Sequence, residues 1–302
     1  MHYVIPHYGS KFLLKKTIKS IQTTDSRASI YIGDDSGRLR KKEFPNIQII
    51  AGPKRGFAPN VNNLMKQIKK GWVCIVNNDM ELDADWKKHI NRCIKEAKGS
   101  KRCIIASKVI NKNGLIDSAG DCFSWFGQGY NRLHLKMIHE KVNESEKIVG
   151  ATGGLMVVEA SVFHSLNGFD EQFGSYVEDT DFNIRAVKAG IKPIFCTKAT
   201  AVHFGSATFN DYAKQYYSAR NSVLNIKKNF IGTLKSQLMF RNIYYWRLKR
   251  TLKPHLKEPI NKGLKDGLTM KIERINEGAK IKRLSQISND SFVKSFWRLI
   301  NL

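Results

Sequence analysis

The sequence lacks several features that define simple classes of protein. No apolar run reaches 18 residues, so no transmembrane helix is expected. The first ten residues, MHYVIPHYGS, have neither the basic nor the apolar region of a signal peptide and are typical of a strand start. The odd cysteine count, without CxxC spacing, predicts reduced thiols, a cytosolic compartment and no zinc site. The five cysteines are Cys74, Cys93, Cys103, Cys122 and Cys196.

Acidic residues are also scarce. The chain has 51 Lys and Arg against 26 Asp and Glu, a formal net charge of +25 at pH 7. Such an excess favours polyanionic partners, namely nucleic acid, acidic lipid or phosphorylated substrates. Residues 227–302 hold 18 Lys and Arg but only 5 Asp and Glu. A nucleic-acid-binding protein is therefore one hypothesis, although zinc-finger spacing and RNP-type aromatic motifs are absent.

The first 110 residues alternate between strand-like and helix-like segments. Apolar runs typical of strands cover residues 2–6, 29–37, 46–52 and 72–80. Apolar residues at helical spacing occur in residues 11–22 and 59–71. This alternation predicts a parallel sheet covered on both faces, and such sheets bind ligands at the carboxyl ends of their strands.

The remaining segments are less regular. Residues 111–150 are rich in Gly and aromatic residues, and we expect loops near a site. Residues 147–163 predict a Gly-rich turn, a strand and a helix. Residues 197–208 predict a final short strand that ends at His203, and residues 211–230 a helix. Basic helical segments are expected from there to the end.

Polar clusters follow two of the predicted strands. Asp34 and Asp35 stand in DDSG, where a carboxylate can accept from a base imide or a ribose hydroxyl. Asp79 ends Asn77-Asn78-Asp79, where a carboxylate can hold Mg²⁺ or Mn²⁺ together with substrate phosphates. Turn formation alone also explains both clusters, because Asp, Asn and Ser favour turns.

Two further segments have weak signals of their own. His203 follows an apolar strand, and an imidazole beside a carboxylate suits Mn²⁺ or Mg²⁺. A lone His is, however, more often structural. Lys54 and Arg55 precede Gly56 and can meet a diphosphate, although basic loops are usually only solvated.

The stretch YVEDTDFNIRAVKAG places three acids, Glu178, Asp179 and Asp181, at the start of a predicted helix. Acids at a helix N-terminus interact favourably with the macrodipole, which explains one or two of them. Three acids after the aromatic and Gly-rich residues 173–176 indicate a site. A carboxylate there can serve as a general base.

The order and spacing of these motifs resemble those of the GT-A glycosyltransferases of family 2, especially the branch with bacterial rhamnosyltransferases. The resemblance covers residues 3–208, with a looser match in YYSARNSVLNIKKN. The matching motifs are VIPHYG, DDSG, RGFAPNVN, NNDM, GATGGLMVVEASVF, NGFDEQF, EDTDFNIRAVKAG and VHFGSAT.

The resemblance implies an α/β GT-A fold, which is a Rossmann-like nucleotide-diphospho-sugar transferase fold. Residues 1–208 would form the catalytic domain, with a nucleotide-binding half (1–110) and an acceptor-binding half (111–208). Residues 209–302 would form a basic, mostly helical extension.

The resemblance also implies inverting sugar transfer from a UDP- or dTDP-sugar to a hydroxyl of a glycan or lipid-linked glycan, as in O-antigen or capsule synthesis. Asp179 would be the catalytic base with Glu178 beside it, and Asp79 with His203 would hold Mn²⁺ or Mg²⁺. Asn77 stands where the family's metal motif often begins with Asp. Residues 121–130 would influence acceptor specificity. Donor binding is implied for Pro6, Asp34, Asp35, Arg55, Gly56, Asn62, Asn78, Gly153 and Gly154.

The basic tail mixes aromatic and cationic residues in RNIYYWRLKRTLK (241–253) and SFVKSFWRLINL (291–302). In the second segment we expect Phe292, Phe296, Leu299 and Ile300 on one helical face. This face either lies on an anionic membrane or packs on the catalytic domain. The protein is accordingly expected in the cytoplasm, free or peripheral on the inner face of the membrane. A catalytically inactive sugar-nucleotide-binding module is a further alternative, which the retained acids and His203 disfavour.

Overall fold

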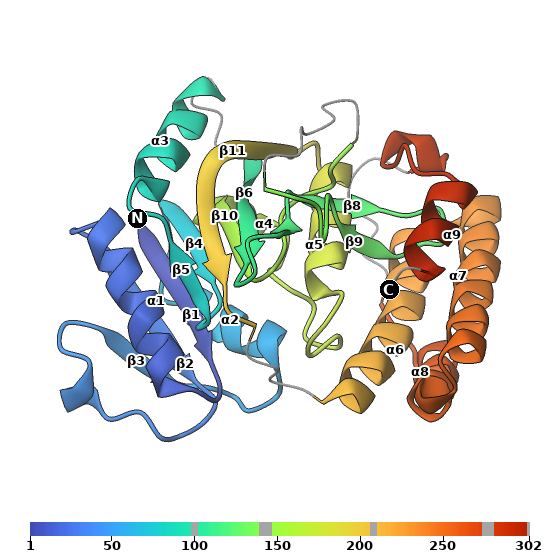
Figure 1. Ribbon diagram of the computed structural model, residues 1–302, viewed down its shortest axis with the longest axis horizontal. Helices are drawn as coiled ribbons and strands as arrows, with labels where there is room; N and C mark the ends of the chain where they lie inside the picture. Colours follow the sequence, from blue (N-terminus) through green and yellow to red (C-terminus); the bar gives the residue numbers. More distant parts are fainter. Residues whose placement is uncertain (98–101, 139–146, 206–209, 274–280, 301–302) are drawn as a thin grey trace.

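The computed structural model describes residues 1–97, 102–138, 147–205, 210–273 and 281–300. A large sheet forms its centre (Figure 1). The strands of this sheet are β1 (His2–His7), β2 (Ser29–Asp34), β3 (Gln48–Ala51), β4 (Trp72–Val76), β5 (Met80–Leu82), β6 (Cys103–Asn111), β7 (Ile116–Ser118), β10 (Leu155–Glu159) and β11 (Lys192–His203). Their order is β3-β2-β1-β4-β10-β6-β11-β5, and β7 pairs with β6.

Only part of the sheet is parallel. Strands β3, β2, β1 and β4 run parallel, as the alternation predicts. Outside the segment with this alternation, the sheet is mixed, because β10 runs antiparallel to both β4 and β6, and β5 antiparallel to β11. The strand predicted over residues 72–80 is confirmed for its apolar part only. Asn77–Asp79 form a turn, so β4 ends at Val76 and β5 pairs elsewhere in the sheet.

Helices cover both faces of the sheet, as predicted. Helices α1 (Lys11–Thr24) and α3 (Trp86–Glu96) pack on one face, where Tyr3 and Ile5 point. Helices α2 (Phe57–Met65), α4 (Ala160–Ser165) and α5 (Glu178–Lys188) cover the other face, where Val4 points. This alternation of buried side chains along β1 explains why that strand is apolar on both sides.

The segment 111–150 contains more structure than the predicted loops. It includes β7 and a hairpin of β8 (Asp121–Phe123) and β9 (Gly129–Asn131). The final strand, β11, begins at Lys192 rather than 197, and it ends at His203 as predicted. Residues 206–208 of the predicted strand, and the predicted boundary at 208–209, lie outside the described residues.

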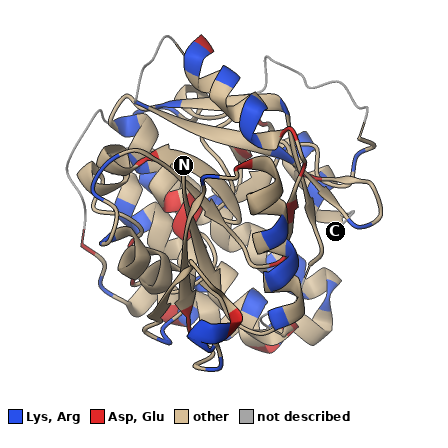
Figure 2. Cartoon of the chain, turned by 90° about the vertical axis from the view of Figure 1, so that its left-hand side faces the viewer, with Lys and Arg blue, Asp and Glu red and all other residues tan. Residues whose placement is uncertain are grey.

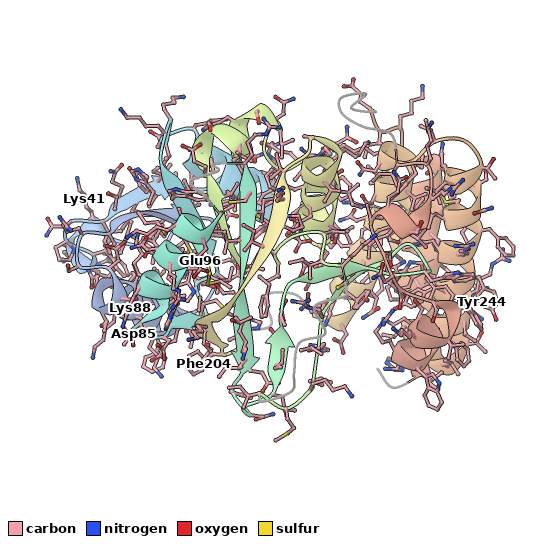
Figure 3. The ribbon with its side chains drawn as sticks, turned by 90° about the horizontal axis from the view of Figure 1, so that it is seen from above. Lys41, Asp85, Lys88, Glu96, Phe204 and Tyr244 are labelled. Atoms are coloured by element: carbon pink, nitrogen blue, oxygen red, sulfur yellow. A yellow bond between two sulfur atoms is a disulfide. The ribbon has the colours of Figure 1, made fainter. Side chains whose placement is uncertain are left out.

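The chain continues as helices α6 (Asp211–Asn229), α7 (Gly232–Leu252), α8 (Lys257–Thr269) and α9 (Phe292–Ile300). They gather at one end of the molecule, and Tyr244 of α7 lies far from Lys41 at the other end (Figures 1 and 3). Ile226 and Leu238 pack with Phe123 and Ile184 of the sheet-containing part. The tail therefore shares a hydrophobic core with the predicted acceptor half.

Helix α9 has one buried side and one exposed side. Leu299 and Ser295 are buried, and Phe292 makes edge contacts with Trp125 and Phe126 next to the β8–β9 hairpin. Part of the predicted apolar face therefore packs on the protein. Phe292 and Ile300 also remain partly exposed, and Asn301 and Leu302 lie outside the described residues.

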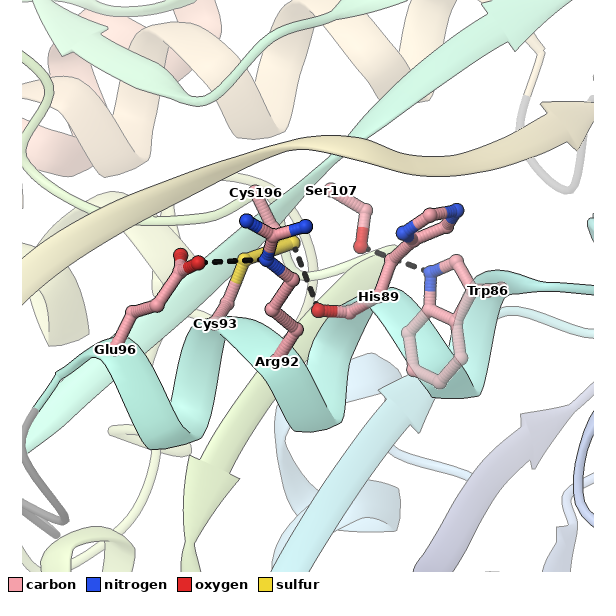
Figure 4. The surroundings of a disulfide bond; sticks show 7 residues. All are labelled: Trp86, His89, Arg92, Cys93, Glu96, Ser107 and Cys196. Carbon is pink, nitrogen blue, oxygen red and sulfur yellow. Dashed lines mark hydrogen bonds and ion pairs between the residues drawn. A yellow bond between two sulfur atoms is a disulfide. The ribbon is translucent and has the colours of Figure 1, made fainter.

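A disulfide joins Cys93 of α3 to Cys196 of β11 (Figure 4). The expectation of five reduced cysteines is therefore wrong, and the cysteine-based argument for a cytosolic location does not hold. The pair is 103 residues apart in sequence, and folding brings the two Cα atoms to 6.1 Å. The three other cysteines are free and buried.

The positive charge is distributed over many elements. Lys and Arg occur on the helices and loops of the face shown in Figure 2, interspersed with fewer acids. No helix in the described part of the chain has both the length and the apolar character that a membrane span requires.

Candidate active site

The NNDM loop and the GATGG loop meet at the edge of the sheet. The Asn77 backbone N–H donates to the Gly154 carbonyl over 2.9 Å, next to the antiparallel pair Val76–Leu155. A Cβ on Gly154 would lie 3.1 Å from Asn77 Nδ2, closer than most side chains approach. The second glycine of the GG pair therefore permits tight contact between the two loops.

Asp179 lies across from the same glycine pair. Its Oδ2 accepts from the Gly153 N–H over 2.8 Å, and its Oδ1 accepts from the Thr180 N–H over 2.7 Å. Burial raises the pKa of the Asp179 carboxyl above its ordinary value, although these hydrogen bonds oppose the shift. A half-buried, oriented carboxylate of raised basicity suits proton abstraction.

The chain reaches Asp179 through an unusual backbone. Tyr176 and Val177 both have positive φ, 67° and 71°, which side chains seldom adopt. The amide of Asn221 in α6 stabilises this turn by donating to three carbonyls, those of Phe173, Ser175 and Tyr176. Two consecutive left-handed residues directly before the acids are typical of a functional site.

The other two acids of the stretch differ from Asp179. Glu178 is buried, and burial followed by the charge of Asp179 raises its carboxyl pKa well above the ordinary value. Asp181 is fully buried and pairs with Arg185 and Lys228 over 2.8 and 2.9 Å. Burial alone would raise the pKa of Asp181, but these cations outweigh it and lower the pKa. Asp181 is thus a structural ion-pair centre as well as a first-turn acid.

Asp121, the first residue of β8, is a further acid near Asp179. It is buried, and burial together with the charges of Asp179 and Asp117 raises its carboxyl pKa well above the ordinary value. Asp121, within the span 121–130, therefore interacts electrostatically with the predicted base.

His203 and Asp79 meet at the same edge, as predicted. His203 Nε2 lies 3.4 Å from Asp79 Oδ2, and the Phe204 N–H donates to the Asp79 carbonyl over 2.9 Å. His203 Nδ1 is 2.7 Å from Oδ2 of Asp117. Burial lowers the pKa of His203, but the hydrogen bonds to Asp117 and Asp79 outweigh it and raise the pKa to about 10.

Asp79 and His203 fit a divalent cation in chemical type and spacing. They offer one carboxylate oxygen and one imidazole nitrogen that already lie close together. Among the described residues no group of three or more His, Cys, Asp or Glu could hold a metal by itself. A cation here would therefore need oxygen ligands from a diphosphate or water, which is the usual manner of Mg²⁺ binding.

Two relatives in sequence are rhamnosyltransferases. No protein-family model matches the chain. Rhamnosyltransferase WbbL of Escherichia coli K12 is 21% identical over 223 residues, which cover 68% of this chain and 83% of WbbL. N-acetylglucosaminyl-diphospho-decaprenol L-rhamnosyltransferase of Mycobacterium tuberculosis H37Rv is 35% identical over 65 residues, which cover 21% of each protein.

Solved structures show the same fold. Residues 1–349 of S. aureus TarS, in complex with UDP-GlcNAc, match with a TM-score of 0.58 and 16% identity over 88% of this chain and 80% of TarS 1–349. Mannosyltransferase PcManGT of Pyrobaculum calidifontis, in complex with GDP-Man and Mn²⁺, matches with a TM-score of 0.52 and 11% identity over 90% and 76% of the chains. The chain has the GT-A fold and is a glycosyltransferase that is similar to rhamnosyltransferases.

In this glycosyltransferase the DDSG loop is held by Asp34. Asp34 Oδ1 accepts from Ser36 and Gly37, and Oδ2 accepts from the Leu39 N–H over 2.9 Å. Burial alone would raise the pKa of Asp34, but the hydrogen bonds lower it. Asp35 Oδ1 accepts from the Lys54 N–H over 2.8 Å. Oδ2 of Asp34 keeps acceptor capacity for a ligand.

The RGFAPNVN segment of the glycosyltransferase is largely engaged in structural contacts. Arg55 pairs with Glu171 over 2.9 Å at an exposed position. A Cβ on Gly56 would lie 2.9 Å from the Gly174 backbone, so Gly56 permits close packing there. The side chain of Asn62 donates to the Phe169 carbonyl and accepts from the Phe169 N–H. These contacts join the segment to the loop before the base.

Two more predicted donor residues lie at the ends of neighbouring strands. The Asn78 amide is 2.7 Å from His7 Nδ1 and donates to the Tyr8 carbonyl over 3.1 Å. Pro6 lies beside Gly33 in the β1–β2 register. Asn78 thus links the NNDM loop to the end of β1, and its amide serves the scaffold of the glycosyltransferase.

Asp117 and His134 belong to none of the motifs that predict the site. Asp117 contacts His203 and His134, at sequence separations of 86 and 17 residues. The local signal for Asp117 is a pair of acids in DSAGD, within a segment whose composition predicts loops. Asn221 lies in YYSARNSVLNIKKN, where the resemblance is looser.

Proposed function

We propose that this glycosyltransferase transfers a sugar, with inversion, from a UDP- or dTDP-sugar to a hydroxyl of a glycan or lipid-linked glycan. One observation carries the proposal. The GG pair contacts Asp179 through Gly153 and the NNDM loop through Gly154. A proton acceptor and a candidate diphosphate site thus stand on either side of one short turn.

The names of the relatives support this choice of substrates. Two of them are rhamnosyltransferases, and the name of the mycobacterial enzyme specifies N-acetylglucosaminyl-diphospho-decaprenol, a lipid-linked sugar. TarS was crystallised with the nucleotide sugar UDP-GlcNAc. These names favour a nucleotide sugar as donor and a lipid-linked glycan as acceptor.

Asp179 would act as the general base. The acceptor oxygen bonds to the anomeric carbon as the bond from that carbon to the diphosphate oxygen breaks, and the acceptor proton moves to the Asp179 carboxylate. The N–H groups of Gly153 and Thr180 each occupy one lone pair and orient the carboxylate. The other lone pairs remain for the acceptor hydroxyl. Burial and the neighbouring charge of Asp179 raise the pKa of the Glu178 carboxyl beside it.

Asp79 and His203 would hold Mn²⁺ or Mg²⁺. The ion would supply positive charge that neutralises the departing nucleoside diphosphate. We propose that Asp34 and Asp35 contact the nucleotide base or ribose, and that Gly153 and Gly154 line the sugar pocket. Pro6, Arg55, Gly56, Asn62 and Asn78 would shape this donor site through the contacts given above.

A donor panel with a base variant tests the proposal. Purified protein is incubated with UDP-, dTDP- and GDP-sugars plus Mn²⁺ or Mg²⁺, and nucleotide release is measured with and without glycan acceptors. Asp179→Asn should reduce turnover by about 10²–10⁴-fold, the typical contribution of general base catalysis, while nucleotide affinity is kept. Asp211→Asn, at the exposed start of α6, is the matched control and should keep full turnover.

Three results would contradict this proposal in different ways. Unchanged turnover in Asp179→Asn would remove Asp179 from its role as base. Absence of nucleotide release with any donor, despite tight nucleotide binding, would favour an inactive binding module. High-affinity binding of nucleic acid without binding of any nucleotide sugar would favour the alternative based on net charge.

The exposed side of α9 supports a peripheral location on the anionic inner face of the cytoplasmic membrane. Val293, Trp297 and Ile300 are spaced as one helical stripe and are exposed by 61%, 59% and 43%. Lys294 is exposed beside them, and the whole tail is strongly basic. Aromatic and aliphatic residues with flanking cations suit an anionic bilayer surface.

Co-sedimentation with vesicles tests this location. Binding is expected with phosphatidylserine-containing vesicles at moderate salt, and much less with phosphatidylcholine alone. Trp297→Ser should weaken it, whereas Leu268→Ser, an exposed apolar residue on α8, should not. Equal sedimentation of all proteins with both vesicle types would count against the stripe as the membrane contact.

A further inference from the structure

Asp117 lies between two imidazoles, outside every motif that carried the family resemblance. It is the middle residue of the short strand β7. Its Oδ2 lies 2.7 Å from His203 Nδ1, and its Oδ1 lies 3.4 Å from His134 Nδ1. The same His134 nitrogen lies 3.0 Å from the Asp117 carbonyl. The side chain of Asp117 is only 21% exposed, so these contacts are partly shielded from water.

The ring of His203 has a carboxylate at each nitrogen. Nδ1 faces Asp117, and Nε2 faces Asp79 at 3.4 Å. A hydrogen bond from Nδ1–H to a carboxylate selects the tautomer whose Nε2 carries a lone pair. Once a cation replaces the Nε2 proton that faces Asp79, the Nδ1–H bond to Asp117 would keep the Nε2 lone pair directed at that shared ion. Carboxylates in this position are known to orient metal-binding imidazoles in general.

Backbone contacts alone leave the ring free to turn. His203 pairs with Met80 across the β11–β5 ladder, and the Phe204 N–H bonds the Asp79 carbonyl. These bonds fix the main chain near the site but not the rotation of the imidazole about its side-chain bonds. Asp117 comes from β7, on a different part of the sheet, and is the residue that contacts the far nitrogen of the ring.

We propose that Asp117 is a positioning residue that holds His203 with its Nε2 directed at a cation shared with Asp79, and that His134 steadies Asp117 from the other side. The inference rests on the proposed metal site of the previous subsection. It gives a role to the carboxylate of Asp117, which belongs to none of the motifs of the family resemblance.

Binding of Mn²⁺ measures this role directly. Isothermal titration of Mn²⁺ into UDP-saturated protein should give at least a tenfold weaker affinity for Asp117→Asn, within the range for supporting residues of metal ligands. Asp117→Glu, which keeps a carboxylate, should recover part of the loss. Glu81→Gln removes a charge from exposed β5 next to Met80 and should change the affinity by less than about twofold.

A spectroscopic measurement distinguishes positioning from a general loss of charge. Pulsed electron paramagnetic resonance of bound Mn²⁺ should show ¹⁴N coupling from an imidazole in the natural protein. The coupling should disappear in His203→Ala and weaken in Asp117→Asn. UDP binding without metal and the circular dichroism spectrum should be unchanged in Asp117→Asn. Should that variant fail to fold, His134→Asn, at a more exposed position, should give a smaller loss of Mn²⁺ affinity in the same direction.

The outcomes separate this inference from the proposal on which it rests. Absence of ¹⁴N coupling in the natural protein would remove His203 as a metal ligand and overturn both. Coupling in the natural protein, with unchanged affinity and coupling in Asp117→Asn, would overturn only the role of Asp117. Equal losses of Mn²⁺ affinity in Asp117→Asn and Glu81→Gln would mean that Asp117 acts only through its negative charge. That result would also overturn the positioning role of Asp117.

Discussion

Glu178, Asp179 and Asp181 occupy one turn of helix, yet each has a different environment. Glu178 is buried beside two other acids, Asp179 is half-buried with two N–H donors, and Asp181 is buried between cations. The pKa therefore rises for the first two and falls for the third. Sequence position alone cannot separate such residues, because their partners lie far away in the chain.

The raised pKa of Asp179 predicts an acid limb in the pH–rate profile. The base must be ionised, so kcat/KM should fall as the pH drops through the pKa of Asp179 in the free enzyme. That pKa lies above the ordinary value of 3.8 for Asp, so activity should decline at a higher pH than for a solvated carboxylate. Initial rates across pH, with circular dichroism at each pH, provide the measurement. A limb at or below 3.8 in folded protein would contradict the assignment.

Asp181 predicts a large effect on stability. Asp181→Ala leaves Lys228 and Arg185 without their shared buried carboxylate, which typically costs about 3–5 kcal/mol. Urea unfolding provides the measurement. Because the folded-state pKa is lowered, the contribution of Asp181 is fully present above the unfolded value of 3.8 and is lost as the pH falls through the folded value.

Asp170→Asn is the matched control for that prediction. Asp170 also pairs with Lys228, over 2.7 Å, but its side chain is 20% exposed. It should therefore cost clearly less than Asp181→Ala. Equal losses in the two variants would indicate that burial of Asp181 is unimportant.

At the scale of elements, helices α6 and α8 pack unusually closely. A Cβ on Gly263 would lie 2.5 Å from the Tyr216 carbonyl oxygen, and one on Gly267 would lie 2.7 Å from that of Arg220. These neighbouring atoms belong to the backbone of α6, so they cannot move away by a change of side-chain rotamer. These two glycines therefore bring α8 onto α6, the helix that also holds the turn before Asp179 through Asn221.

Gly263→Ala should destabilise the protein although Ala favours helices. The added methyl group would force the two helices apart, and overpacking of this kind typically costs about 1–3 kcal/mol. Chemical denaturation gives the free energy of unfolding. Lys265→Ala, an exposed change in the same helix, should have little effect. A higher free energy of unfolding in Gly263→Ala would contradict this prediction, because α6 and α8 would then accommodate the methyl group without loss of packing.

Apolar patterns in the sequence predict most of the elements that precede β10, the strand that runs antiparallel to β4. Strand β1 follows from a short continuous apolar run, and helix α1 from apolar residues at helical spacing. The reversal at β10 was not predictable, because a fully buried strand is apolar on both faces whichever way it runs. The small strands β7, β8 and β9 are only three residues each, too short for a period to be recognised.

At the scale of the whole molecule, the disulfide links distant parts of the chain. It closes a stretch of 103 residues between α3 and the strand that ends at His203. Cross-links over long stretches stabilise mainly by restricting the unfolded chain, typically by about 2–4 kcal/mol.

Cys93→Ser should lower the free energy of unfolding by about that amount. Dithiothreitol should destabilise the natural protein to the same extent and leave Cys93→Ser unaffected. Thermal and urea unfolding with and without reductant provide the comparison. Titration of five free thiols in the non-reduced, denatured protein would contradict the bond.

The candidate site was predictable in part, through the ordered motifs. Asp79 and His203 were expected together and lie 3.4 Å apart. The role of Asp117 could not be anticipated, since nothing local in the chain shows which imidazole a carboxylate will meet. The apolar face predicted for α9 is only in part the face that is exposed. The sequence cannot show which apolar residues of this helix pack on the β8–β9 hairpin.

The antiparallel course of β10 has a consequence for how such an enzyme can change over evolutionary time. Because β10 runs against β4, its first residue stands beside the last residue of β4, and the two loops that hold the reactive groups face each other at one register position. Their separation is set by ladder hydrogen bonds and is independent of the length of the turn between β8 and β9. Insertions in that turn can therefore be tolerated while the spacing of the two loops is inherited unchanged.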